Sequence, residues 1–339
     1  MKEFYGFPVA LPSCYEADLE DAILRVARWR NDDLCVVFPI ITDLHSALET
    51  TDPLFGQRRD SASHILLMND IADKFQADFT VDLGDEGIDV PLKTHDEMEK
   101  LTARILQYRR ASKQRPALFV KGNHDTRLTG FPEHFWEKAF MEINSGVSMT
   151  YGGDGSYGFF DVPGKKTRVF WLNTSECREF LSDAQLEFLK KNLDLLEKDH
   201  CAVVLQHICS FRIIYQGVKR EARPFPSGLE KLDRILKEFV RRGGRLAGSI
   251  SGHGHYNADV MDDGVNNFTL QGYGGIGPRE SPPFARIALE FDPLLDRTDT
   301  FDMTKYSMIH LVVIKPEPGE MKIFRIGAGG SACDTGAYF

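Results

Sequence analysis

Paired cysteines are missing from this chain of 339 residues. Its six cysteines are scattered, and none of them belongs to a Cys-x-x-Cys pair. That spacing excludes a zinc ribbon and a thioredoxin-like redox motif, and a disulfide framework is not expected at this length. Cys35 lies in the apolar run Leu34–Phe38, where we expect it to be a small buried side chain.

Long apolar runs are also missing. No stretch approaches the ~18 to 20 apolar residues that a membrane-spanning helix requires. The first residues carry one lysine, and prolines interrupt their apolar stretch before it reaches the length of a signal peptide. We therefore expect a reduced cytoplasmic protein that does not associate with membranes, although a secreted protein trimmed of its leader would have the same sequence.

Basic runs are absent as well, and the balance of charge is acidic. The chain has 41 Lys and Arg residues against 50 Asp and Glu residues, which gives a formal net charge of −9. Binding to a nucleic-acid backbone without regard to base sequence needs a basic surface, so the composition disfavours a nucleic-acid partner. We expect a small-molecule partner instead. The sequence does not determine the oligomeric state.

Helical patterns and apolar runs alternate along most of the chain. The periodicity predicts helices at 16–31, 61–76, 95–112, 182–197 and 228–242. Short apolar runs predict strands at 34–41, 79–81, 117–120, 169–172, 202–205 and 246–250. This strand–loop–helix rhythm predicts an α/β fold with functional residues in the loops at the carboxyl ends of its strands.

The pattern changes after residue 260, where strands and turns replace helices. Extended segments are predicted at 268–271, 284–291, 308–314 and 321–326. Pro316–Gly319 is a hairpin signal between the last two of these segments. The tail 327–339 is rich in glycine, and we expect it to be irregular.

Five polar motifs follow these predicted strands. In chain order they are Asp43-Leu44-His45, Gly84-Asp85, Gly122-Asn123-His124-Asp125, His207 and Gly252-His253-Gly254-His255. If the strand ends meet at one edge, the motifs bring together three Asp and Asn oxygens and four imidazoles, with His124 left over. Such a mixture of oxygen and imidazole donors is the ligand set of a hydrolytic site with two metal ions.

Each motif taken alone has a simpler explanation. A lone His207 after a strand is more often a core histidine than a ligand, and Asp43 could cap the next segment. The pair Gly84-Asp85 could be an ordinary turn. Asp82 and Glu86 flank Asp85, and they are as easily solvated or capping side chains as hydrogen-bond acceptors beside a ligand. The simple explanation requires all five coincidences together, so we reject it.

The ordered set resembles the calcineurin-like metallophosphoesterase superfamily, whose pattern is D-x-H, G-D, G-N-H-[D/E], a lone His and G-H-x-H. The resemblance spans about residues 34–260. It implies a four-layer α/β/β/α sandwich of two mixed β-sheets flanked by helices. We expect residues 1–275 to form the catalytic domain. We expect residues 276–339 to form a β-rich extension packed on that domain, where it completes the second sheet or makes a small lid.

The resemblance also implies which residues bind metal. One ion would be held by Asp43, His45, Asp85 and His255, and the other by Asp85, Asn123, His207 and His253. Asp85 would therefore bridge the two ions, and its carboxylate would offset their mutual repulsion. Imidazole ligands suit Mn, Fe, Ni or Zn better than Mg or Ca, so we expect two transition-metal ions without knowing which.

Three further residues would act on the substrate if the resemblance holds. A hydroxide that bridges the metals would attack phosphorus, and His124 would protonate the leaving-group oxygen. Asp125 would orient the His124 ring, and Arg127 would bind a phosphate oxygen. The chain would then be a metal-dependent phosphoric ester hydrolase that acts on a small soluble substrate.

The substrate class stays open at this stage. The run Gly122–Asp125 followed by Arg127 is similar to bacterial cyclic-nucleotide phosphodiesterases of the superfamily, which favours a phosphodiester. A phosphomonoesterase acting on a nucleotide or sugar phosphate is the alternative, and a recombination-type nuclease is disfavoured by the acidic charge. A non-catalytic scaffold with the same fold is the rival from another class. Such scaffolds usually lose metal ligands, whereas the full set stands here.

Overall fold

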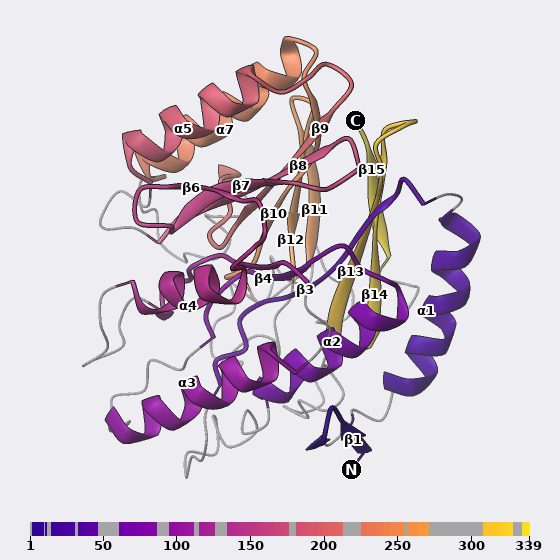
Figure 1. Ribbon diagram of the computed structural model, residues 1–339. Coiled ribbons are helices and arrows are strands. Elements are labelled where there is room, and N and C mark those ends of the chain that lie inside the picture. Colours follow the sequence, from indigo (N-terminus) through magenta and orange to yellow (C-terminus); the bar gives the residue numbers. More distant parts are fainter. Residues whose placement is uncertain are drawn as a thin grey trace, which may run out of the picture.

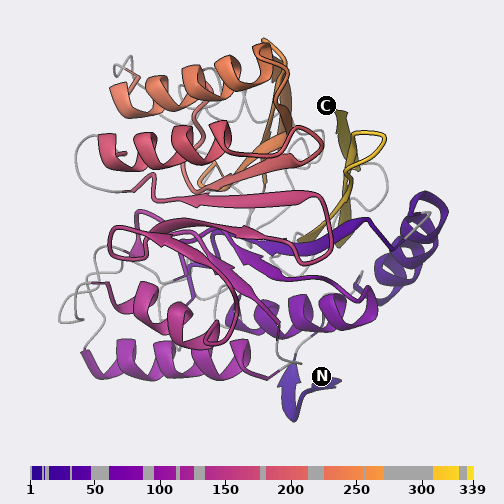
Figure 2. The ribbon, with the colours of Figure 1, turned by 45° about the horizontal axis from the view of Figure 1, so that its top comes forward.

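Two β-sheets pack face to face, and helices cover their outer faces (Figures 1 and 2). The structure, a computed structural model, describes residues 2–9, 11, 15–30, 33–46, 61–86, 95–111, 115–125, 134–175, 181–212, 225–254, 257–270, 308–327 and 334–339. Both sheets combine parallel and antiparallel strand pairs. The four-layer α/β/β/α sandwich expected from the sequence is therefore confirmed.

The first sheet has six strands in the described part of the chain, in the order β15-β14-β13-β3-β4-β5. The parallel strands are β3 (Val36–Ile41), β4 (Thr80–Asp82) and β5 (Ala117–Phe119). The antiparallel strands are β13 (Met308–Lys315), β14 (Glu320–Gly327) and β15 (Thr335–Tyr338). A small separate hairpin is formed by β1 (Lys2–Phe4) and β2 (Phe7–Val9).

The second sheet has seven described strands in the order β11-β12-β10-β9-β8-β7-β6. Its four central strands are parallel: β12 (Val265–Thr269), β10 (Arg245–Ser251), β9 (Cys201–Gln206) and β8 (Thr167–Leu172). Antiparallel strands extend both sides: β11 (Ala258–Asp262), β7 (Tyr157–Asp161) and β6 (Thr150–Gly152).

The helices form the two outer layers. Buried side chains join the six-stranded sheet to α1 (Tyr15–Trp29), α2 (His64–Lys74), α3 (His95–Arg109) and α4 (Phe135–Ile143). A short 3-10 helix at Ser61–Ser63 precedes α2. The seven-stranded sheet is covered by α5 (Asp183–Asp194) and α7 (Ser227–Arg241), which lie together on its outer face in Figure 2.

Strand β3 shows why the apolar runs of the sequence are continuous. Val36, Phe38 and Ile40 point into the core between the two sheets. Val37 and Ile41 point the other way, into the core beneath the helices. Successive side chains of a strand face opposite sides of the sheet, so a strand covered on both sides is apolar at every position. Its polar continuation, Thr42 onward, therefore marks the place where the strand leaves the core.

The C-terminal strands differ from what the sequence predicts. Strands β13 to β15 make neither a lid nor part of the second sheet, because β13 pairs antiparallel with β3 and so belongs to the sheet built by the first half of the chain. The prediction of an irregular tail is also wrong, since Thr335–Tyr338 pairs along β14 as the edge strand β15. The predicted segment 284–291 and the domain division at residue 275 both lie in the range 271–307, outside the described residues. The division stays a prediction.

The helix ends follow local chemistry. Ser182, the N-cap of α5, accepts a hydrogen bond from the backbone of Gln185. The Gln185 side chain bonds to the backbone amide and carbonyl of Asn173, the residue that follows β8. Strand β8 is thereby tied to the start of α5.

No helix among the described residues has the length and apolar character needed to span a membrane. Cys35, Cys201 and Cys209 are buried free thiols. Cys35 is fully buried directly before β3, as its apolar neighbourhood predicts. Burial also raises the pKa of the Cys201 thiol to about 11, so this group stays protonated and unreactive at neutral pH.

Candidate metal centre

The polar motifs of the sequence follow the carboxyl ends of five parallel strands, three in one sheet and two in the other. Strands β3, β4 and β5 lead to Asp43, Asp85 and Asn123, while β9 and β10 lead to His207 and His253. His255 and Arg127, which the resemblance also implicates, lie outside the described residues. The strand ends of both sheets therefore converge on one site, as expected for an open α/β fold.

Backbone hydrogen bonds continue the pairing of β3 and β4 beyond the strands. The amide of Asp43 donates to the carbonyl of Gly84 at 2.8 Å, and the amide of His45 donates to the carbonyl of Asp85 at 2.8 Å. The amide of Ser46 donates to Glu86 at 2.7 Å. The first two motifs are thus fixed against each other by main-chain bonds.

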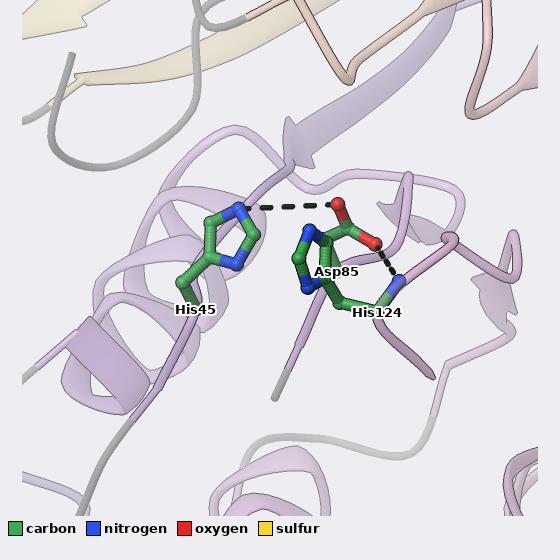
Figure 3. Close-up of side chains that lie close together, drawn as sticks. All are labelled: His45, Asp85 and His124. Carbon is green, nitrogen blue, oxygen red and sulfur yellow. Dashed lines mark hydrogen bonds and ion pairs between the residues drawn. The ribbon is translucent and has the colours of Figure 1, made fainter. Parts of the chain in front are cut away.

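Asp85 lies at the centre of the site. Its carboxylate oxygen Oδ1 accepts the backbone amide of His124 at 2.8 Å, and Oδ2 lies 3.8 Å from Nε2 of His45 (Figure 3). The same Oδ2 lies 3.1 Å from Nε2 of His207. Only about 1% of the Asp85 surface is exposed, so this carboxylate serves both halves of the site from a buried position.

Two groups of potential metal ligands share this aspartate. In one, ligand atoms of His45, Asp85 and His124 lie within 4.8 Å of one another, and in the other those of Asp85, His207 and His253 do. Asp43 joins the first group, with its Oδ1 at 3.9 Å from Nε2 of His45. The first group also admits His124 as a ligand, a role that the sequence resemblance gives to a different histidine.

The ring of His207, which follows β9 of the second sheet, is oriented by a backbone carbonyl that follows β4 of the first sheet. Its Nδ1 lies 2.7 Å from the carbonyl oxygen of Leu83, which can only accept, so this nitrogen carries the proton. The other nitrogen, Nε2, faces Asp85 and lies 3.2 Å from Oδ1 of Asn123. Holding one ring nitrogen as a donor leaves the other available as a ligand, which is the usual arrangement of a metal-binding histidine.

Close backbone approach explains the glycine that precedes His253. A Cβ atom at Gly252 would overlap the hydroxyl of Thr42 and come within 2.7 Å of Oδ2 of Asp43. That Asp43 oxygen accepts the backbone amide of His253 at 2.9 Å and the Thr42 hydroxyl at 2.6 Å. The fifth and first motifs therefore touch directly across the two sheets, and only glycine permits this distance.

Asp125 stabilises the loops of the site. The resemblance predicts that it orients the His124 ring, but its two carboxylate oxygens accept main-chain amides. Oδ2 accepts those of Asp85 and Gly122 at 2.8 Å each, and Oδ1 accepts that of Glu86 at 3.0 Å. Asp125 thus holds the loop of the third motif against the turn that carries Asp85.

Asp82 and Glu86 are buried next to the site, so neither is the solvated side chain that the sequence allows. Both pair with the guanidinium of Arg109, at the end of α3. Asp82 also accepts the backbone amide of Gly84 at 2.8 Å. The sequence gives no signal for Arg109, because a helical arginine far from any motif reads as a surface residue. Thr42, which donates to Asp43, and Thr174, which accepts the amide of Ile208 at 2.8 Å, were also not predicted from the sequence.

Burial and neighbouring charges both shift the pKa values of Asp85, His207 and Asp125. Burial alone would raise the pKa of Asp85, but the neighbouring histidines, His207 foremost, lower it well below its usual range. Burial opposes charging of His207, yet Asp85 outweighs this effect and raises the pKa of His207 to about 9. Burial, reinforced by Asp85, raises the pKa of Asp125 to about 7. A metal ion at His207 must therefore displace a proton.

The match with known proteins identifies the family. A model of the family described as calcineurin-like phosphoesterase matches residues 38–257, which is more than half of the chain. The chain belongs to the calcineurin-like phosphoesterase family. This phosphoesterase is therefore a metal-dependent phosphoric ester hydrolase. A search of curated proteins finds no relative.

Solved structures share the fold of the phosphoesterase. A dimetal phosphatase from Danio rerio is 16% identical with a TM-score of 0.60, and the match covers 90% of this chain and 99% of that one. A purple acid phosphatase from yellow lupin seeds is 12% identical with a TM-score of 0.53, covering 88% of this chain and 52% of that one. GAP50 of Plasmodium, described as the anchor in the inner membrane complex, is 13% identical with a TM-score of 0.52, covering 90% and 88%. Likeness at these identities concerns the fold.

The donor set of the phosphoesterase fits two transition-metal ions. Carboxylate, amide and imidazole atoms converge from both sheets, and one buried carboxylate belongs to both groups of ligand atoms. Such a mixture of nitrogen and oxygen donors suits Zn, Mn, Fe or Ni rather than Ca or Mg. The family implies a dimetal centre, and the convergence of these side chains is what such a centre requires.

Proposed function

We propose that the chain hydrolyses phosphodiesters of small soluble molecules with two transition-metal ions. The residues that would hold the ions are Asp43, His45, Asp85, Asn123, His207, His253 and His255. The observation that carries the proposal is the position of Asp85, whose Oδ2 faces His45 at 3.8 Å and His207 at 3.1 Å. A single carboxylate between two groups of imidazoles is the arrangement expected of a bridging ligand.

The bound ions would supply Lewis acidity and an activated water molecule for attack at phosphorus. The protein's own residues would bind the phosphate group and donate a proton to the leaving group. His124 is partly exposed beside His45, with the two ring centres 4.9 Å apart. From this position its ring can donate a proton to the departing oxygen, the role of a general acid. Arg127, two residues after Asp125 in the chain, would bind a phosphate oxygen.

The preference for diesters rests on the sequence, because the run from Gly122 to Arg127 is similar to cyclic-nucleotide phosphodiesterases. The names of two structural neighbours keep a second candidate in view, since both are phosphatases. The second candidate is a phosphomonoesterase that acts on nucleotides or sugar phosphates. The net charge of −9 opposes a nuclease that binds duplex ends.

The test is hydrolysis of bis(p-nitrophenyl) phosphate beside p-nitrophenyl phosphate in the presence of Mn²⁺. We expect the wild-type chain to favour the diester and the Asp85→Ala variant to lose all metal-dependent turnover. Asp161→Ala is the matched control, because Asp161 is an exposed carboxylate on β7 that pairs with Arg168. The control should keep full activity.

Each result has a distinct meaning. Preference for the monoester would replace the proposed substrate class with the second candidate. Full activity of Asp85→Ala would refute the proposal that Asp85 is a ligand shared by two metal ions. A wild-type chain that binds no metal and stays inert in Mn²⁺ would instead point to a scaffold with this fold.

A further inference from the structure

A buried arginine brackets the turn that carries Asp85. The Arg109 guanidinium pairs with Asp82, three residues before Asp85, and with Glu86, one residue after it. Its side chain is 2% exposed, and both carboxylate side chains are fully buried. A buried ion pair is costly in free energy unless its geometry is good and its remaining polar atoms are bonded. We therefore ask what role other than stability this cluster has.

The bracketed turn has an unfavourable backbone. Asp85 has φ +58°, a left-handed conformation that costs energy for any residue except glycine. Such a conformation persists only where its surroundings over-determine it. From the third motif, the buried Asp125 holds the turn through the amides of Asp85 and Glu86. From the end of α3, Arg109 holds it through the side chains of Asp82 and Glu86.

The helix that supplies Arg109 is itself fixed. The carbonyl of Tyr108, the preceding residue, accepts Nδ2 of Asn69 from α2 at 2.9 Å. The guanidinium lies over the ring of Phe140 from α4, 5.6 Å from its centre. Arg109 therefore transmits the position of three packed helices to the turn of the second motif.

We propose that Arg109 is a positioning residue that sets the carboxylate of Asp85 for metal binding. The inference rests on the proposed function, because it assumes that Asp85 binds metal. Arg109 does not touch the substrate or the ions in this assignment. It acts through Asp82 and Glu86, which keep the strained turn in the conformation where one carboxylate faces both His45 and His207.

Whether metal affinity falls or rises when Arg109 is removed distinguishes the positioning role from a purely electrostatic effect of its charge. Arg109 is a positive charge close to a cation site, so as a charge alone it weakens metal binding. Its removal would then tighten binding. If Arg109 positions Asp85, its removal weakens binding because the shared ligand is no longer held in place.

The experiment measures Mn²⁺ binding to the metal-free protein by isothermal titration calorimetry. We expect Arg109→Met to bind at least tenfold more weakly than wild type, and Arg109→Lys to lie between them. Arg115→Met is the matched control. Arg115 pairs with Asp73 of α2, and it precedes β5 at the end of the strand away from the site. Its loss should lower the melting temperature while the Mn²⁺ affinity stays that of wild type.

The outcomes distinguish this inference from the proposed function. If wild type binds no Mn²⁺, the metal centre itself is refuted. If wild type binds Mn²⁺ and Arg109→Met binds equally or more tightly, the positioning role is overturned. Should Arg109→Met fail to fold, Arg109→Lys decides, since it keeps the charge and shortens the reach to the two carboxylates. Unchanged affinity in Arg109→Lys would then overturn the inference, and weaker affinity would support it.

Discussion

Single residues of the metal centre hold backbone conformations that their side chains do not favour. Asp43, His45, Asp85 and His253 all have positive φ angles. Each such conformation costs about 1 to 3 kcal/mol in a residue other than glycine. Hydrogen bonds hold these backbones before any ion arrives. The amides of Asp43 and His45 donate to the turn that carries Asp85, the amide of Asp85 donates to Asp125, and the amide of His253 donates to Asp43. The ligands are thereby preorganised, which lowers the conformational cost of binding metal.

His124 is the residue whose role a substitution can define most directly. We expect His124→Asn to lower kcat by roughly 10²- to 10⁴-fold, the usual contribution of a general acid, while the protein keeps both metal ions. Steady-state kinetics and metal analysis of the same sample provide the measurement. His134→Asn is the control, since that histidine precedes α4 and pairs with Asp154. Loss of one ion in His124→Asn would show that His124 is instead a ligand beside His45.

The strands that carry the site end within one residue of their predicted ends, and so does α7, whose end shows the physical reason. It stops at Arg241, and Gly243 follows with φ +83°. The amides of Gly243 and Gly244 donate to the carbonyls of Val240 and Phe239 at 2.9 and 3.0 Å, which is a Schellman motif. This end directs the chain into β10, which leads to His253.

Gly243 offers a test of that helix end. No atom lies within 4 Å of a Cβ built at this position, so a substitution meets backbone strain alone. We expect Gly243→Ala to lower the free energy of unfolding by about 1 to 2 kcal/mol. Gly243→Asn should cost less, because asparagine tolerates the left-handed conformation better. Urea denaturation measures both, and equal losses would contradict the conformational explanation.

The sequence predicted elements well where apolar residues decide the structure, and less well elsewhere. The strand at β3 and the helix end at Gly243 follow from continuous apolar residues and from glycine chemistry. The edge strand β15 did not, because Thr335–Tyr338 has few apolar residues and becomes extended only by pairing with β14. Arg109 could not be predicted either, since its two partners precede it by many residues and only the fold brings them together.

At the scale of the whole molecule, the two ends of the sequence meet in one sheet. Strand β3 carries the first motif and lies between β4 and the C-terminal β13. The C-terminal strands also fill the core between the sheets, through Val312, Ile314, Met321 and Ile323. They are therefore structural parts of the sandwich that holds the metal centre.

This arrangement predicts that residues 1–275 do not fold by themselves. Removing β13 and β14 deletes these four core side chains of the inter-sheet layer, each worth about 1.5 to 3 kcal/mol of burial. Their sum is comparable with the whole stability of a typical domain, ~5 to 15 kcal/mol. Near-ultraviolet circular dichroism and thermal unfolding test the truncated chain. The control is residues 1–327, which lose only the edge strand β15 and should fold with reduced stability. A cooperative unfolding transition in residues 1–275 would contradict this prediction and support the domain division at residue 275.

The place of β13 has a consequence for protein synthesis. The ribosome makes β3 long before β13, so the growing chain presents β3 with one edge unpaired while the residues between the two strands are synthesised. At ~5 to 20 residues per second this interval is on the order of tens of seconds. An exposed apolar edge invites pairing with other chains, so the nascent polypeptide needs shielding by chaperones during that time. Asp43 and His45, which follow β3, gain their final support only after β13 has been made.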